Sequence, residues 1–428
     1  MSEWKTLTVP EFTDVISGST PATSIGEYWD GDIEWVTPVD LSKLHSRYLK
    51  STIRKISKLG LGNSSTGLIP ANNVVMSSRA PIGYFAIPTN DFTTNQGCKS
   101  FKLYPQQDAE FHYYNFLLHI DYFKRFGSGS TFAEISKSDI EKLSFNVPTS
   151  LAEQRKIARI LSTVDAVIEK SEAAIAKYKA IKSGMMRDLF TRGIDMKTGK
   201  LRPRYEDAPE LYKQSELGWV PKEWEIVKLE NACIKIQDGT HFSPQTTIGP
   251  YMYVTSKNIR FGYLDMMNVG WISEQEHVDI YKRCDVKFGD VLLTKDGANT
   301  GNVAFNNIKE EFSLLSSVAL LRCDEIIYHN YFLFYTLFSP QLQQVMTDLM
   351  SGNAITRLTL TKINSIIVQK PCYVEQCAIA SKLKTIHTLE EHEIKVLQKN
   401  MALKSALMSD LLTGKVRVKY EEEKAEAQ

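Results

Sequence analysis

A run of about fifty residues near the N-terminus carries basic side chains and no acidic ones. Between Asp40 and Asp91 the chain has no aspartate or glutamate, although 50 acidic residues in 428 would on average place about six there. Its cations are Lys43, Arg47, Lys50, Arg54, Lys55, Lys58 and Arg79. Clustered positive charge attracts the phosphates of nucleic acid. The stretch therefore predicts a DNA-facing surface, with backbone contacts from Lys43, Arg47, Lys50, Arg54 and Lys55. The alternative is a solvated loop whose charges balance acids elsewhere in the fold.

Turns that combine small residues with a long basic one could reach base edges. SSRAPIG (77–83) and TKDGANTG (294–301) are of this kind, because small residues let the backbone approach a groove while Arg or Lys extends into it. In the first half of the chain the candidates for base contact are Ser78, Arg79, Ser128, Ser130 and Thr131. In the second half, the counterparts by register of the backbone-contact and base-contact candidates together are Lys257, Asn258, Arg260, Lys295, Asn299, Asn353 and Arg357. Taken singly, such turns are also ordinary hairpin loops.

Residues arranged for catalysis are missing from the sequence. It has no GxxxxGK[ST] or GxGxxG phosphate loop, no HExxH and no Asn-Pro-Pro-aromatic stretch. The six cysteines form no CxxC pair and the eight histidines form no cluster, so we expect no metal site. His387 and His392 are expected to face solvent. The chain is predicted to be non-catalytic, with no cofactor of its own. A net charge of +1 provides no attraction to DNA over the whole chain.

Two globular segments with short strands are expected to position these loops. Runs of β-branched and aromatic residues bounded by turn formers predict strands. The first half has VVMSS, GYFAI, SFKLY and LSFNV, and the second has YMYVT, DVLLT, NVAFN, VALLR and SIIVQ. The fold class is therefore mixed α/β, or α+β.

An internal repeat shows that the two halves are duplicates. Residues 153–191 align without a gap to residues 375–413. The identities include Glu153 with Glu375, Gln154 with Gln376, Ile157 with Ile379, Leu161 with Leu383, Lys182 with Lys404 and Asp188 with Asp410. Weaker matches upstream pair residues 127–140 with 350–363. So long a period indicates duplicated domains rather than a solenoid.

Each repeat copy has the periodicity of a coiled coil. Steps of four and three carry the apolar seam of the first copy through Ile157, Leu161, Val164, Ile168, Ile175, Tyr178, Met185 and Leu189. The second copy has Ile379, Leu383, Ile386, Leu397, Leu407 and Leu411, but places Glu390 and Glu393 in its middle. We expect two long helices paired as an antiparallel coiled coil with pseudo-twofold symmetry. The alternative is that each helix folds back on its own domain.

These patterns divide the chain into five parts. They are a first globular domain (1–148), a central helical spacer (149–194), a connector and second globular domain (195–371), a C-terminal helical spacer (372–416) and a charged tail expected to be disordered (417–428). The sequence has no apolar run of the length that spans a bilayer and no signal-peptide pattern at its start, so a cytoplasmic protein is expected.

The repeated phrase resembles a known family. Two diverged domains, each followed by EQxxIAxxL and KSxxMxDL, with ELGWVPKEWEIVKL (216–229) opening the second half, resemble the specificity subunit of type I restriction-modification systems. The resemblance implies that each domain recognises one half of a bipartite site in double-stranded DNA. It also implies that the spacers set the gap and dock two methylation subunits, which bring S-adenosylmethionine. Restriction subunits would bring ATP and Mg chemistry. A competing hypothesis is a coiled-coil scaffold that pairs two protein-binding domains without DNA specificity.

Overall fold

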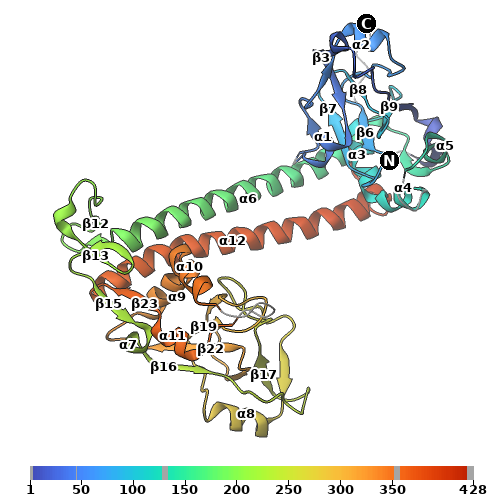
Figure 1. Ribbon diagram of the computed structural model, residues 1–428. Coiled ribbons are helices and arrows are strands. Elements are labelled where there is room, and N and C mark those ends of the chain that lie inside the picture. Colours follow the sequence, from blue (N-terminus) through green and yellow to red (C-terminus); the bar gives the residue numbers. More distant parts are fainter. Residues whose placement is uncertain (1–2, 45, 128–133, 351–356, 422–428) are drawn as a thin grey trace. The chain divides into compact units, whose positions relative to one another are not determined.

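The computed structural model describes residues 3–44, 46–127, 134–350 and 357–421 (Figure 1). The chain forms two compact units. Unit 1 comprises Met1–Glu172 with Lys395–Gln428, and unit 2 comprises Ala173–Ile394. Ser128, Ser130, Thr131 and Asn353 lie outside the described residues.

The described residues of unit 1 form three small sheets. β1 (Trp4–Thr8) pairs with β10 (Ser144–Pro148). A five-stranded sheet has the order β2 (Thr13–Ser17), β9 (Cys98–Leu103), β6 (Val74–Ser77), β7 (Phe85–Pro88) and β4 (Tyr48–Leu49). In a three-stranded sheet, β3 (Trp29–Val36) lies between β5 (Lys55–Ile56) and a parallel β8 (Phe92–Thr94).

Helices and aromatic residues close the core of unit 1. The helices are α1 (Pro38–Ser42), α2 (Lys58–Gly62), α3 (Ala109–Leu118), α4 (Ile120–Phe126), α5 (Lys137–Glu141) and the first part of α6 (Leu151–Thr191). Phe101, Phe116 and Phe123 are fully buried. Ile157 of α6 and Leu411 of the C-terminal helix belong to the same apolar cluster, so both long helices cover this domain.

Unit 2 repeats the same plan. β15 (Glu225–Lys228) pairs with β23 (Ile367–Lys370). The larger sheet has the order β16 (Cys233–Asp238), β22 (Val318–Cys323), β19 (Val291–Thr294) and β20 (Val303–Phe305). In the smaller one, β17 (Tyr251–Val254) lies between β18 (Gly270–Ile272) and a parallel β21 (Phe312–Leu314). The helices of this unit are α7 (Leu229–Ala232), α8 (Glu274–Tyr281), α9 (Asn330–Phe338), α10 (Pro340–Leu349), α11 (Leu360–Ser365) and the first part of α12 (Tyr373–Leu412).

The strands and the duplication predicted from the sequence are confirmed. The predicted runs correspond to β6, β7, β9 and β10 in unit 1 and to β17, β19, β20, β22 and β23 in unit 2. The connector forms two hairpins in addition to the predicted strands. These are β11 (Ile194–Asp195) with β12 (Lys200–Leu201), and β13 (Tyr212–Ser215) with β14 (Gly218–Pro221). Gly199 and Gly218 lie at the turns of these hairpins with positive φ, a backbone conformation that favours glycine. The hairpin strands are too short for a sequence pattern to reveal them.

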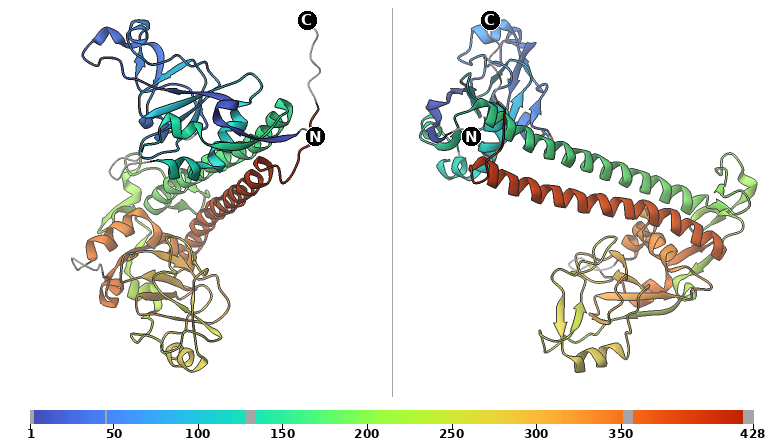
Figure 2. Two further views of the ribbon diagram at one scale, coloured as in Figure 1. Left: turned by 90° about the vertical axis from the view of Figure 1, so that its right-hand side faces the viewer. Right: turned by 180° about the vertical axis from the view of Figure 1, so that it is seen from behind.

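The two long helices pair inside each unit and run antiparallel there. In unit 1, Lys404 Nζ of α12 lies 2.6 Å from Asp165 Oδ1 of α6. In unit 2, Lys182 Nζ lies 2.5 Å from Glu390 Oε2. Figures 1 and 2 show the helices side by side within each unit. All the predicted seam residues are buried or half-buried. The alternative in which each helix covers only its own domain is therefore wrong.

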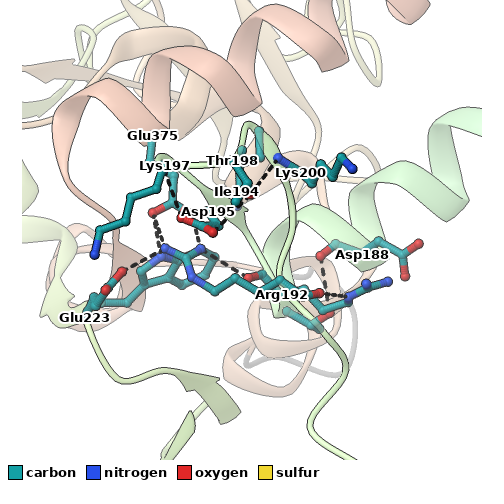
Figure 3. Close-up of polar contacts among 12 residues, drawn as sticks. Asp188, Arg192, Ile194, Asp195, Lys197, Thr198, Lys200, Glu223 and Glu375 are labelled. Atoms are coloured by element: carbon teal, nitrogen blue, oxygen red, sulfur yellow. Dashed lines mark hydrogen bonds and ion pairs between the residues drawn. The ribbon is translucent and has the colours of Figure 1, made fainter. Parts of the chain in front are cut away.

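In each unit a buried glutamate accepts hydrogen bonds from the segment that follows a long helix. In unit 2, Glu375 accepts hydrogen bonds from Ile194 N at 2.7 Å, Arg202 Nη1 at 2.6 Å and Trp224 Nε1 at 3.1 Å, in the cluster of Figure 3. Gly193, with φ +62°, packs where any side chain would meet Glu375 and Trp224.

Unit 1 repeats this arrangement with the chain's last described segment. Glu153 accepts hydrogen bonds from Arg417 Nε and Nη2, both at 2.9 Å, and from Trp4 Nε1 at 3.4 Å. Val418 is 8% exposed. The prediction that disorder begins at 417 is therefore wrong for these residues, because they fill the site that the connector fills in unit 2. In the described part of the chain, no helix has both the length and the apolar character needed to cross a membrane.

Candidate nucleic-acid interface

Part of the acid-free stretch remains an open cationic surface. Lys43, Lys50 and Lys58 are exposed, and within the described residues they have no ion-pair partner. Arg54 is exposed as well, and its guanidinium lies 3.6 Å from the ring centre of Trp29. Stacking on the indole holds Arg54 without neutralising its charge. These four cations can meet phosphates, and their contact with DNA stays a prediction.

Two other cations of the stretch form ion pairs with acidic residues of the same unit. The Arg47 side chain is 14% exposed and lies 3.9 Å from both Glu110 and Asp165. Lys55 Nζ lies 2.8 Å from Glu34, and this hydrogen bond raises the pKa of Lys55. Both cations are therefore neutralised by acids outside the stretch, as the solvated-loop alternative proposed. They are not free backbone contacts in this structure.

Several predicted base-contact residues instead hold loops in place. Ser78 is fully buried, and its backbone N–H donates to Gly97 O at 2.8 Å. Asn258 is 5% exposed, accepts from Thr255 N at 3.0 Å and donates to Asp265 O at 3.0 Å. Side chains buried in this way cannot reach a base, so the assignments of Ser78 and Asn258 are corrected.

The remaining candidates of unit 2 differ in accessibility. Lys257 is exposed, while Arg260 pairs with Asp265 at 3.2 Å. Asn299 Nδ2 donates to Ser256 O at 3.2 Å and so joins two loops at the same edge of the unit. Lys295 is 2% exposed. It is too deeply buried to touch DNA in this conformation.

The turn after β6 in unit 1 carries a linked set of charges. Arg79 and Glu134 face each other in an isolated antiparallel bridge, and Ile135 N donates to Ser78 O at 3.0 Å. Glu134 Oε2 accepts from Arg79 Nε at 2.9 Å. Its other oxygen, Oε1, lies 3.8 Å from Nζ of Lys99, which is 6% exposed. Burial lowers the pKa of Lys99, and the nearby carboxylate opposes this effect.

The turn after β19 in unit 2 carries the same set from different positions. Asp296 and Arg357 form the matching bridge, and Leu358 N donates to Lys295 O at 2.7 Å. Asp296 Oδ2 lies 3.0 Å from Lys295 Nζ. Its Oδ1 lies 3.0 Å from Arg357 Nε, as an ion pair without hydrogen-bond alignment. The predicted alignment of residues 127–140 with 350–363 is thereby confirmed for its described part.

Sequence reasoning missed three members of these sets: Lys99, Glu134 and Asp296. Lys99 directly precedes the predicted strand SFKLY and belongs to the observed strand β9, and no sequence pattern indicated its burial. Asp296 is acidic, and a phosphate-facing surface is indicated by positive charge. The alignment of the two halves could have identified the two acidic residues, because it places Arg79 at the position equivalent to Asp296 and Glu134 at the position equivalent to Arg357.

A duplicated α/β domain with a charged loop edge, carried on paired helices, defines a two-domain binding protein. The profile of the type I restriction modification DNA specificity domain matches residues 1–177 and 221–399. The chain therefore belongs to that family, and contains two copies of its domain.

Relatives and solved structures agree with this assignment. The chain is 27% identical over 427 residues to the type I restriction enzyme MjaIX specificity subunit of Methanocaldococcus jannaschii, covering 97% of this chain and 94% of the relative. The MjaVIII specificity subunit of the same organism is 24% identical over 426 residues, with coverage of 97% and 94%. The S subunit of the type I restriction-modification system of M. genitalium has the same fold, with a TM-score of 0.63, 16% identity and 96% coverage of each chain.

Proposed function

We infer that this protein is the DNA sequence-recognition subunit of a type I restriction-modification complex. Each unit recognises one half of a bipartite target in double-stranded DNA. The observation that carries the proposal is the duplicated charged edge, which occurs on two copies of a DNA specificity domain. Contacts to phosphates position such a protein on DNA, and contacts to base edges provide specificity.

The chemistry of the complex belongs to partner subunits. The relatives are named as specificity subunits of type I restriction enzymes. We propose that two methylation subunits dock on the helical spacers and bring S-adenosylmethionine. Restriction subunits would add ATP-dependent and Mg-dependent steps. This chain would contribute recognition and spacing.

The paired helices are proposed to set the gap between the half-sites. Each helix is continuous over 41 or 40 residues, and a straight helix of that length extends about 60 Å. Such a spacer would separate the two half-sites by a constant number of unread base pairs.

Methylome sequencing of a host that expresses this chain with its methylation subunit tests the proposal. The expected result is one methylated motif made of two half-sites separated by a constant gap. A scaffold that pairs two protein-binding domains would give no sequence-specific methylation that depends on this chain, and that result would refute the DNA-recognition role.

A further inference from the structure

The two charged edges share one arrangement of a lysine, a carboxylate and an arginine but are built from different residues, and in unit 2 the lysine, Lys295, also lies 3.4 Å from Asp238. In each unit one carboxylate lies between a buried lysine and a half-exposed arginine. Unit 1 uses Lys99, Glu134 and Arg79, whereas unit 2 uses Lys295, Asp296 and Arg357. The arginine and the carboxylate have exchanged sides of the bridge. Simple inheritance from the duplicated ancestor would have left each residue type on its original strand. The same set of lysine, carboxylate and arginine occurs in both units although the arginine and the carboxylate have exchanged positions. This indicates a shared role.

The geometry leaves the same part of each arginine available. Glu134 and Asp296 engage the Nε atom of Arg79 and Arg357, at 2.9 and 3.0 Å. Within the ranges that the structure describes, no residue binds the terminal Nη atoms of either arginine. The two side chains are 53% and 56% exposed. Each guanidinium is thus held at its Nε atom, while about half of the side chain stays exposed.

We propose that Arg79 and Arg357 each recognise a guanine in their half-site, with Glu134 and Asp296 as positioning residues. This inference rests on the proposed function. A guanidinium fork matches the paired O6 and N7 acceptors of guanine in the major groove. Fixing the fork in advance reduces the entropy lost on binding.

A phosphate is the less suitable ligand for these arginines. A carboxylate beside each fork repels an anion, whereas guanine is neutral. Unit 1 also has uncompensated cations for phosphates in Lys43, Lys50 and Lys58. The buried lysine on the far side of the carboxylate pairs with it and holds it in place, so that the carboxylate can direct the arginine.

Binding-site selection with the assembled complex tests the inference. Arg79→Lys retains the charge but removes the fork, and it should lower the preference for guanine at one position of one half-site by about 5- to 100-fold. Arg357→Lys should do the same in the other half-site. The unaffected half-site and the gap serve as internal references. Arg187→Lys, an exposed arginine on α6, is the matched control and should leave the motif unchanged.

The positioning role is tested by exchanging the pair. Arg79→Asp combined with Glu134→Arg gives unit 1 the layout of unit 2. This double variant should recover at least about 5-fold of the guanine preference that Arg79→Asp alone removes. A merely structural role predicts uniform weakening of binding, with no change at a single base.

The outcomes separate the inference from the function on which it rests. The inference is overturned if a parental half-site lacks guanine, or if both Arg→Lys variants keep the parental motif. It is also overturned if Arg79→Lys weakens all sequences equally with a smaller salt dependence, which would indicate a phosphate contact. If the parental complex selects no motif at all, the proposed function fails instead.

Discussion

At the scale of single residues, the surroundings decide what a charged or titratable group does. Lys50 and Lys55 lie five positions apart in one basic stretch, yet Lys50 is exposed and Lys55 is paired with Glu34. His387 was expected to face solvent from its place on a helix. Its side chain is 13% exposed and stacks on Phe334, because α9 covers α12 at this point. The expectation for His387 was therefore wrong.

The burial of His387 predicts loss of stability in acid. Burial, assisted by nearby Lys182, lowers the pKa of His387 to about 4, against about 6.5 in an unfolded chain. Between these values the unfolded state binds more protons, so the free energy of unfolding should fall by up to about 3 kcal/mol as pH drops through this window. Hydrogen exchange of α9 amides in unit 2, measured from pH 7 to pH 4, checks this.

His387→Phe should remove most of that pH dependence, and His392→Phe, on the exposed face of α12, is the control. An identical pH dependence in His387→Phe and the parent protein would contradict the assignment.

At the scale of elements, the interface between the two long helices accommodates buried charged side chains where they form an ion pair. Lys182 and Glu390 interrupt the two seams at facing positions, and they are 11% and 8% exposed in their side chains. A buried ion pair contributes little net stability, but removing one partner leaves a charge uncompensated.

Lys182→Met should therefore destabilise unit 2 by about 3 to 5 kcal/mol, and adding Glu390→Met should recover most of that loss. Denaturant unfolding of the two single variants and the double variant measures the coupling. Lys179→Met, at an exposed position of α6, should have little effect. If the single and double variants were equally unstable, the pairing would not explain the polar seam.

Helix length is the other property that belongs to this scale. Inserting four residues after Glu172 in α6 and four after Ile394 in α12 keeps the helix pairing inside each unit. The insertion adds about 6 Å, and we expect the preferred gap to lengthen by one or two base pairs, with both half-sites unchanged. Methylome sequencing provides the comparison. A parental gap in the double-insertion variant would refute the spacer role.

At the scale of the whole molecule, the duplication makes the two recognition domains separable. Replacing residues 224–370 with the corresponding domain of a relative should change one half-site and leave the other intact. The reason is that unit 1 has its own sheets and core, with no strand pairing to unit 2 among the described residues. Binding-site selection on the chimaera tests this. A change in both half-sites would contradict independent recognition.

Local sequence patterns were enough to predict the strands and the helical seam, and aligning the two halves of the chain was enough to find the repeat. Apolar runs rich in β-branched residues and heptad spacing are properties of neighbouring residues, so β6, β19 and the Ile157–Leu189 seam could be predicted directly. The site was less predictable. Arg79, Lys295 and Arg357 of the two charged sets were named from the sequence, and their contact with DNA stays a prediction. Lys99, Glu134 and Asp296 were not named, and Ser78 and Asn258 are buried.

Only the tertiary structure decided which cations are free and which are held. Arg47 meets Glu110 and Asp165 across more than sixty positions of chain, and Arg417 meets Glu153 across a separation of 264. Coulomb interactions depend on distance in space, and the sequence encodes that distance only through the fold.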